Sequence, residues 1–303
     1  MSDYVQSHSD KIDFNTSDSW VIMSEIEQSI KGKIEAVGIP LRDWDIQINY
    51  GIKTGYNDAF VITTDKRDEI LANCQNDEER ARTSEIIRPI LRGRDIKRYG
   101  FDWDDLDGLW LINTHNGVKE KYPPVDIKNY PAIKQHLDLY WDKISKREDQ
   151  GVTPYNLRNC AYMDDFNKPK IVYAELARTG NAFTIDTNKM LVGNTGYIIT
   201  FDSEVSEERL YCLTGFLNSK AILFYLDNSC SKFDENGWRW LRQFVENIPI
   251  PQKTDHQLYS EVTKAIEEQC NNDCLQRINS IVYEILGLTL DEIAYLEKKY
   301  ANY

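Results

Sequence analysis

The sequence predicts an α/β protein of the mixed α+β type, with short mixed β-sheets, flanking helices and a helical C-terminal segment. Short β-like runs separated by turn residues precede Glu207, and helical periodicity dominates after it. Apolar residues make up 41% of the 303 residues, which is enough for a folded core. We expect residues 1–17 to be disordered or a linker, residues 18–251 to form an α/β domain, and residues 252–303 to form the helical segment.

The first helix is predicted at residues 18–38. An isoleucine recurs every four residues from Ile22 to Ile34, which places these side chains on one helical face. Gly38 and Pro40 are typical of a helix end and of the chain that leaves it.

Two β-like runs, Asp45–Tyr50 and Ala59–Thr63, flank the glycine loop GIKTGYN at 51–57. Glycine lets a backbone approach a ligand closely, and the other side chains of this loop are polar or amphipathic. The loop therefore has the composition of a ligand contact, made by Lys53, Thr54, Tyr56 and Asn57.

The remaining elements are predicted from the same periodicities. In chain order they are a charged helical region at 66–91, a strand at 109–114, a helix at 130–149 with Ile133, Leu137, Trp141 and Ile144 on one face, strands at 170–176, 182–186 and 196–201, and helices from Glu207 onward, two or three of them amphipathic helices in the last fifty residues.

The charge argues against a protein that binds nucleic acid without regard to sequence. The formal net charge is −13 and the pI is near 4.9, whereas nonspecific binders usually present a broad basic face to the phosphates. A local basic cleft stays compatible with these values. Six cysteines lack the spacing of a zinc site or a disulfide framework, and no stretch resembles a leader or a membrane span. We expect a cytoplasmic protein with reduced thiols and no membrane partner.

No catalytic constellation is evident. The four histidines lie far apart, and the sequence has no Gly-x-Ser-x-Gly elbow, no Walker lysine loop and no G-x-G-x-x-G. Paired carboxylates are common in a chain with 49 acidic residues and are most simply solvated surface groups. We predict no catalytic residue, no metal site and no bound cofactor in this chain.

Three further loops carry clusters of basic side chains, and one of these clusters also contains an asparagine. Arginine and asparagine read guanine and adenine through paired hydrogen bonds, and lysine and threonine hold phosphates. The pattern favours sequence-specific DNA reading, although each cluster alone is also compatible with a solvated surface or a turn. Trp238 and Trp240 flank one cluster and could equally straddle a core, with one ring inside and one outside. The candidates are Arg92, Arg94 and Lys97 in one cluster, Arg178 and Asn181 in the second, and Arg239 and Arg242 in the third.

The motifs GIKTGYNDAFVI, IIRPILRGRDIKRY, YPAIKQHL, KPKIVYAEL, NTGYIIT, LTGFLNSKAILFYL and IPIP occur in this order. This ordered set resembles the TaqI-like C-terminal specificity region of adenine-specific DNA methyltransferases. These include bifunctional type IIG restriction-modification enzymes and related phage-defence methyltransferases. The resemblance covers roughly residues 18–300 and implies a target recognition domain at 18–251, with double-stranded DNA as its partner.

The resemblance also implies a larger parent enzyme. The family's S-adenosylmethionine loop of the F-x-G-x-G kind and its Asn-Pro-Pro-Tyr tetrapeptide are both missing from this sequence. We therefore expect a C-terminal, non-catalytic fragment whose partner is a methyltransferase domain of the same parent chain. That domain would use S-adenosylmethionine, and Mg²⁺ where the parent also cleaves DNA. The alternatives are a specificity subunit that docks on a separate methyltransferase chain and a stand-alone enzyme of unknown chemistry.

In the family, the glycine loop lies where the catalytic domain meets the recognition domain. The resemblance therefore implies that Lys53, Thr54, Tyr56 and Asn57 face the DNA backbone or the cleft beside the flipped base, and that Arg92, Arg94 and Lys97 line the same cleft. Base-reading roles for Arg178, Asn181, Arg239 and Arg242 rest on side-chain chemistry alone.

Overall fold

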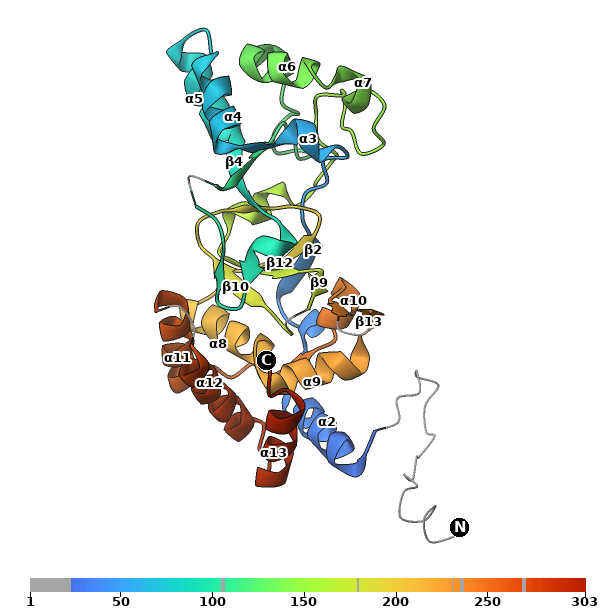
Figure 1. Ribbon diagram of the computed structural model, residues 1–303, viewed down its shortest axis with the longest axis vertical. Coiled ribbons are helices and arrows are strands. Elements are labelled where there is room, and N and C mark those ends of the chain that lie inside the picture. The colour runs from blue at the N-terminus through green and yellow to red at the C-terminus, as the bar shows by residue number, and fades with distance from the viewer. Residues whose placement is uncertain (1–22, 105–106, 179, 231, 235–236, 269–270) are drawn as a thin grey trace. The chain divides into compact units, whose positions relative to one another are not determined.

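The structure, a computed structural model, describes residues 23–104, 107–178, 180–230, 232–234, 237–268 and 271–303 (Figure 1). The segment predicted at 1–17 and the isoleucine at position 22 lie outside these ranges. The chain divides into two compact units. Unit 1 contains the chain up to Trp44, the stretch from Arg178 to Asn181, and everything from Ser206 onward, and unit 2 contains Asp45–Ala177 and Ala182–Val205.

The first sheet of unit 2 confirms most of the predicted strands. Its order is β10-β8-β12-β2, and all neighbouring strands pair antiparallel. Every residue of β8 is buried, as expected for a central strand of isoleucine, valine and tyrosine. The strands are β2 (Ile46–Tyr50), β8 (Lys170–Ala174), β10 (Phe183–Asp186) and β12 (Gly196–Phe201).

A second sheet of unit 2 has the order β11-β4-β7-β3, with β11 parallel to β4 and the other pairs antiparallel. Its β4 corrects the prediction that residues 66–91 are helical throughout. Pro89 has no amide hydrogen for a helix interior, and Ile87 and Leu91 bury their side chains in the sheet. The elements here are β3 (Val61–Thr63), α4 (Thr64–Ala72), α5 (Asp77–Ile86), β4 (Ile87–Leu91), β7 (Leu109–Ile112) and β11 (Leu191–Val192).

Two other predictions for unit 2 are wrong at element boundaries. The predicted strand at 59–63 begins only at Val61, because α3 (Asn57–Phe60) forms a helical turn first. The predicted helix at 130–149 is two short helices, α6 (Pro131–Asp138) and α7 (Trp141–Ile144). The turn between them leaves Trp141 43% exposed, whereas Ile133, Leu137 and Ile144 are buried as predicted.

Smaller elements complete unit 2. They are β5 (Ile96–Lys97), β6 (Gly100–Phe101) and β9 (Leu176–Ala177), and the 3-10 helices η2 (Gly93–Asp95), η3 (Ile127–Asn129) and η4 (Met163–Asn167).

Unit 1 is mainly helical, as predicted for the region after Glu207, and it also includes the first helix. Ile30 and Ile34 of that helix are fully buried and Ile26 is partly buried, which confirms the predicted isoleucine face over the described residues. The helices are α2 (Glu25–Val37), α8 (Glu207–Leu217), α9 (Lys220–Ser229), α10 (Arg242–Val245), α11 (His256–Glu267), α12 (Asn272–Ile285) and α13 (Leu290–Lys299). The short elements are η1 (Leu41–Asp43), the paired strands β1 (Ile39–Pro40) and β15 (Pro249–Ile250), and the paired strands β13 (Lys232–Asp234) and β14 (Gly237–Arg239).

Carboxylates join the two ends of unit 1, where α2 and α13 lie side by side (Figure 1). Glu292 of α13 accepts hydrogen bonds from Ser29 and Lys33 of α2, each at 2.7 Å. Glu27 of α2 accepts one from Lys299 at 2.8 Å. Burial alone would raise the pKa of both carboxyls, but these hydrogen bonds outweigh it and lower each pKa to about 2. Both groups therefore stay charged in the folded protein well below neutral pH.

Lys170 and Asp186 form a fully buried ion pair in the first sheet of unit 2. They lie opposite each other on β8 and β10, with 2.5 Å between Nζ and Oδ2. Lys170 also donates to the Phe166 carbonyl at 2.8 Å, and the carboxylate accepts the amides of Asn188 and Met190 at 2.7 and 2.9 Å. Burial lowers the pKa of Lys170, and the Asp186 charge opposes that shift. Each charge is thus compensated only while the other is present.

Asp186→Asn should test this pair, because it removes the compensating charge and keeps the size of the side chain. We expect the free energy of unfolding to fall by about 3–5 kcal/mol, since a buried ammonium group loses its counter-ion. Lys168→Met is the matched control, because Lys168 pairs with Asp165 on a partly exposed surface, and it should cost less than about 1 kcal/mol. Urea denaturation followed by circular dichroism measures both variants. Equal losses would contradict the role given to the buried pair.

The contact between α2 and α13 should weaken in acid. Unfolded glutamates titrate at about pH 4.3, so the stabilisation is complete above that value and is lost as the pH falls toward the folded pKa of about 2. Glu292→Gln should flatten this part of the pH profile of Tm. Glu284→Gln, on an exposed position of α12, should leave it unchanged. An equally steep profile for Glu292→Gln would count against the hydrogen-bonded carboxylate as the cause.

Candidate nucleic-acid interface

Three segments that are distant in sequence meet in unit 2, where they adjoin strands of its two sheets. We call residues 51–57, 91–95 and 192–196 the crossover junction. The segments share backbone hydrogen bonds from Gly51 to Gly196 (2.8 Å), from Ile52 to Val192 (2.7 Å) and from Gly193 to Leu91 (2.8 Å). The glycine loop that was predicted to contact a ligand therefore also contacts other segments of its own chain.

Glycine is required where these segments cross. A Cβ atom at Gly51 would lie 2.1 Å from the Gly193 carbonyl oxygen, and one at Gly93 would lie 2.5 Å from the Thr195 carbonyl oxygen. Real Cβ atoms do not approach backbone oxygens so closely. Gly55 has a φ of 70°, a left-handed conformation that favours glycine. The junction is thus determined by backbone contacts that any larger residue would disrupt.

A buried arginine forms hydrogen bonds with the glycine loop. Arg147 is 6% exposed, and its guanidinium donates to the carbonyls of Thr54, Asn156 and Pro154, the last at 3.1 Å. Its Cζ atom lies 4.3 Å from the centre of the Phe60 ring. These contacts couple the conformation of the loop to the core of unit 2.

The side chains of the loop are ordered by one hydroxyl group. The Thr54 hydroxyl accepts the amide hydrogen of Tyr56 at 3.2 Å and donates to the Asn57 side-chain oxygen at 2.6 Å. Thr54 itself is buried, Tyr56 packs on the ring of Tyr140 at 6.1 Å, and Asn57 is exposed. The nearby ammonium group of Lys53 lies 5.6 Å from the Tyr50 ring. Of the four loop candidates, Asn57 is the one whose side-chain amide is exposed to solvent and also fixed by a hydrogen bond.

The crossover junction borders a pocket of about 580 Å³ in unit 2. Residues from all three segments line it, and Val61, Ile90 and Leu176 add an aliphatic wall. Four of the predicted site residues lie around this pocket, namely Thr54, Asn57, Arg92 and Arg94. The structure thus brings together the glycine loop and the first basic cluster, which are separated by more than thirty residues in the sequence.

The three cations of that cluster differ in what they contact. Arg92 forms two hydrogen bonds of 2.8 Å with the carboxylate of Asp95. Lys97 lies 3.1 Å from a carboxylate oxygen of Asp102 and donates to a backbone carbonyl. Arg94 is exposed, and within the described ranges no ion pair or side-chain hydrogen bond engages its guanidinium. Arg94 is therefore the cation of this cluster that is best placed to bind an anion.

The other four candidates belong to unit 1. Arg178 and Arg239 are exposed, and Arg242 pairs with Glu246 at 2.9 Å. Asn181 is 1% exposed, and its amide donates to the carbonyls of Leu217, the last residue of α8, and Ser219, which directly precedes α9. This position suits a structural role for Asn181 rather than contact with a base.

The tryptophans of the third cluster are both buried, so the interpretation with one ring inside and one outside is wrong. The rings of Trp238 and Trp240 stack at 5.7 Å with 13° between their planes. Residues two apart along an extended chain point to the same side, which explains why both rings enter the core. They leave no exposed ring for stacking on a ligand.

Several residues of the site carried no signal that pointed to them. Arg147 lies in a charged helical pattern, KISKRED, that gives no hint of burial. Asn194 and Thr195 line the pocket within the motif NTGYIIT, and the Thr195 hydroxyl accepts the Gly93 amide hydrogen at 2.8 Å. The Gly-Asn-Thr-Gly run could have been recognised as a tight turn, but not as the partner of Gly93.

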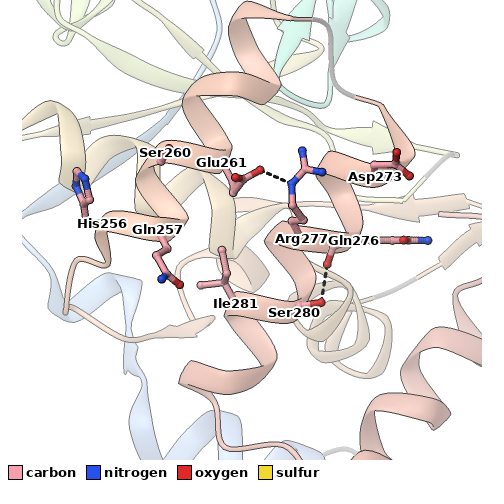
Figure 2. Close-up of a pocket in the computed structure, with 9 residues that line it drawn as sticks. All are labelled: His256, Gln257, Ser260, Glu261, Asp273, Gln276, Arg277, Ser280 and Ile281. Carbon is pink, nitrogen blue, oxygen red and sulfur yellow. Dashed lines mark hydrogen bonds and ion pairs between the residues drawn. The ribbon is translucent and has the colours of Figure 1, made fainter.

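A larger groove of about 790 Å³ lies in unit 1 between α11 and α12 (Figure 2). Two of its charged side chains pair with each other, since Arg277 lies 2.6 Å from Glu261, and Lys264 of α11 lies 2.7 Å from the same carboxylate. Burial alone would raise the pKa of Glu261, but these two cations lower it. Because its arginine is already paired with Glu261, this groove is a weaker candidate for binding an anion than the pocket of unit 2.

The structure also bears on metal binding and on membrane-spanning helices. Among the described residues, no three His, Cys, Asp or Glu side chains gather as metal ligands would. In the same ranges no helix has the length and apolar character needed to cross a membrane. The five cysteines that the structure describes are free thiols.

Comparison with known proteins supports the expected fold. The chain resembles a solved structure of the type IIL restriction-modification enzyme MmeI in complex with DNA, with 13% identity, a TM-score of 0.56, and coverage of 87% of this chain and 35% of that chain. The type IIG restriction endonuclease BpuSI matches with 13% identity, a TM-score of 0.49, and coverage of 86% and 33%. A search of curated proteins found no match.

At 13% identity the likeness to MmeI shows a shared fold and nothing more. The chain spans about a third of the length of these two enzymes. The model of one family, described as the TaqI-like C-terminal specificity domain, matches residues 88–250, which include Arg94 and both sheets of unit 2 in part. Since this range is more than half of the sequence, the chain belongs to the family of TaqI-like C-terminal specificity domains.

Proposed function

We propose that this chain is the sequence-specific DNA recognition module of a restriction-modification DNA methyltransferase. It would direct N6-adenine methylation, and cleavage where the parent also cuts DNA, by domains that are not in this chain. The observation that carries the proposal is the crossover junction. There the guanidinium of Arg94, which pairs with no other residue that the structure describes, and the hydrogen-bonded amide of Asn57 border one pocket.

The chemistry of these groups fits DNA. A guanidinium without an internal partner can bind a phosphate or the edge of a guanine, and a side-chain amide can hydrogen-bond to a base edge. Both groups project from segments whose backbones are fixed by close contacts, so they are organised before the ligand arrives. The solved structure of MmeI with DNA supports the same class of ligand.

The net charge of −13 is compatible with this function if the module supplies specificity and the parent supplies much of the affinity. The expected partners are double-stranded DNA and the methyltransferase domain of the same parent chain. S-adenosylmethionine would bind that domain, and Mg²⁺ would serve a nuclease domain where one exists.

Selection from a random duplex library at low salt tests the proposal directly. We expect the parent enzyme to enrich a short motif, and the 303-residue chain to enrich the same motif more weakly, because phosphate contacts are shared across the whole enzyme. Enrichment is read by sequencing after several rounds, with a salt titration of the selected duplex. Failure of both proteins to enrich any motif would refute a role in sequence recognition.

Arg94→Ala should mainly weaken DNA binding, whereas Arg92→Ala should mainly lower the stability of the fold. Loss of Arg94 should weaken binding of the selected duplex and reduce the slope of log K against log salt by about 1, with an unchanged Tm. Loss of Arg92 should lower the free energy of unfolding by about 1 kcal/mol, because Asp95 loses its paired cation. Fluorescence anisotropy between low and moderate salt measures the slope.

The matched control is Arg82→Ala on α5, whose guanidinium reaches Glu78 only at 4.0 Å. It removes the same charge from an exposed surface and should leave the slope unchanged. If Arg82→Ala and Arg94→Ala change the slope equally, the effect comes from net charge, and Arg94 makes no specific contact.

A further inference from the structure

A group of apolar side chains lies on the surface of unit 2, at the turn between α6 and α7 and on the loop at 150–157. Leu139 in the turn is 77% exposed, Trp141 is 43% exposed, and Val152 in the loop is 66% exposed. The rings of Trp141 and Tyr155 lie 5.3 Å apart, which joins the turn to the loop. We call Leu139, Trp141, Val152 and Tyr155 the apolar patch. An exposed cluster of large apolar side chains usually marks an interaction surface.

Polar contacts hold the apolar patch in place. The Tyr155 hydroxyl donates to one carboxylate oxygen of Asp138 at 2.6 Å, and the Lys134 ammonium group donates to the other oxygen at 2.6 Å. The same ammonium group lies 5.3 Å from the centre of the Tyr155 ring. The Val152 amide donates to the Asn116 side-chain oxygen at 2.7 Å. The exposed apolar side chains therefore project from segments that hydrogen bonds fix to the rest of unit 2.

The apolar patch is continuous with the glycine loop of the crossover junction. Tyr140, in the same turn as Leu139, packs on the ring of Tyr56 at 6.1 Å. Arg147 donates to the Thr54 carbonyl of the glycine loop and also to two carbonyls of the loop at 150–157. The helical turn α3, which follows the glycine loop, lies beside α6 (Figure 1). A duplex bound at the crossover junction is thus the ligand that lies nearest to the apolar patch.

The charges beside the apolar patch balance one another. The exposed charged residues of the stretch that follows Trp141 are two lysines, Lys143 and Lys146, and two acids, Asp142 and Glu148. Attraction to phosphates therefore contributes little at this place. Affinity of the apolar patch for DNA would have to come from apolar contact with the bases.

A projecting leucine fits a duplex better than it fits a protein partner. A stable protein interface buries roughly 800 Å² on each side, of which these four side chains could supply only a small part. A duplex, by contrast, accepts single apolar side chains. Leucine and similar wedges insert between base steps from the minor groove, unstack them in part and kink the duplex by about 20–90°. Leu139 has the size and the exposure for this, and Trp141 offers a ring beside it.

We propose that Leu139 is a wedge that enters the bound duplex between two adjacent base pairs and kinks it, with Trp141 and Val152 packed against the opened step. Both base pairs stay intact, and no nucleotide leaves the helix. The inference rests on the proposed function and adds a second way of choosing a site. Steps that unstack easily, such as TA and CA/TG, accept a wedge at lower cost, so the apolar patch selects a flexible step that no hydrogen bond reads.

The test measures the bend of the selected duplex by energy transfer between dyes at its two ends. The wild-type protein should bend it by about 20° or more. Leu139→Ala should abolish the bend and weaken binding about tenfold, because a buried leucine contact is lost. The slope of log K against log salt should not change, since the lost contact is apolar. Leu139→Met keeps a long apolar side chain and should keep the bend.

Leu290→Ala is the matched control, because Leu290 is 84% exposed and belongs to α13 in unit 1. It removes the same atoms from an exposed leucine and should leave both the bend and the affinity unchanged. Leu139→Ala and Leu290→Ala should keep the Tm of the wild-type protein, since neither side chain is part of the core. Sedimentation of each variant without DNA shows whether its oligomeric state has changed.

These outcomes separate the two proposals. If the wild-type protein binds its motif but leaves it straight, or if Leu139→Ala bends it as the wild-type protein does, no wedge enters the duplex and the inference is overturned. If Leu139→Ala instead changes the oligomeric state without DNA, the apolar patch contacts a second copy of the chain, which also overturns it. If neither the wild-type chain nor its parent binds any duplex, the proposed function itself fails.

Discussion

Close backbone crossing at glycine is the constraint on which the rest of unit 2 depends. Three segments that adjoin strands of the two sheets meet there, and at Gly51 and Gly93 those segments approach until no side chain fits between them. Because the hydrogen bonds there join backbone to backbone or to the Thr195 hydroxyl, the geometry does not rely on flexible side chains. The neighbouring residues are therefore free to carry function. Asn57 and Arg94 project from segments whose backbones are held by these contacts.

Two buried cations stabilise unit 2 in different ways. Lys170 is neutralised by Asp186, so that pair ties two strands of one sheet together. Arg147 instead donates to backbone carbonyls, among them that of Thr54 in the glycine loop. Burial lowers the pKa of Arg147 to about 10, and Asp149 opposes the shift, so the guanidinium remains charged at neutral pH. A buried charge satisfied by loop carbonyls stabilises the protein only while those loops keep their conformation, which links loop geometry to overall stability.

The sequence allowed the strands at 170–176, 182–186 and 196–201 to be predicted, because each is an apolar run bounded by turn residues. It misled at Ile87–Leu91, where a charged helical pattern runs into a buried strand, and at Trp141, where a turn moves the ring out of the core. The glycine loop and the cluster at Arg92 were predicted as site residues, but their meeting around one pocket depends on strand pairing across more than a hundred residues. Local patterns carry no information about such pairing. Nor could they show that Asn181 is buried between two helices.

Counting basic residues gives a poor estimate of how much positive charge this chain offers to DNA. Arg92, Lys97 and Arg242 each contact a carboxylate of the same chain, so their charges are largely compensated before any phosphate arrives. A module of this kind gains little from counterion release, which is the sequence-independent part of DNA affinity. Its contribution must then come from directional hydrogen bonds and shape, which depend on the sequence of the DNA. Under the proposed function, a chain whose described basic clusters are largely paired would contribute the choice of site, and the domains proposed for the parent enzyme would hold the duplex.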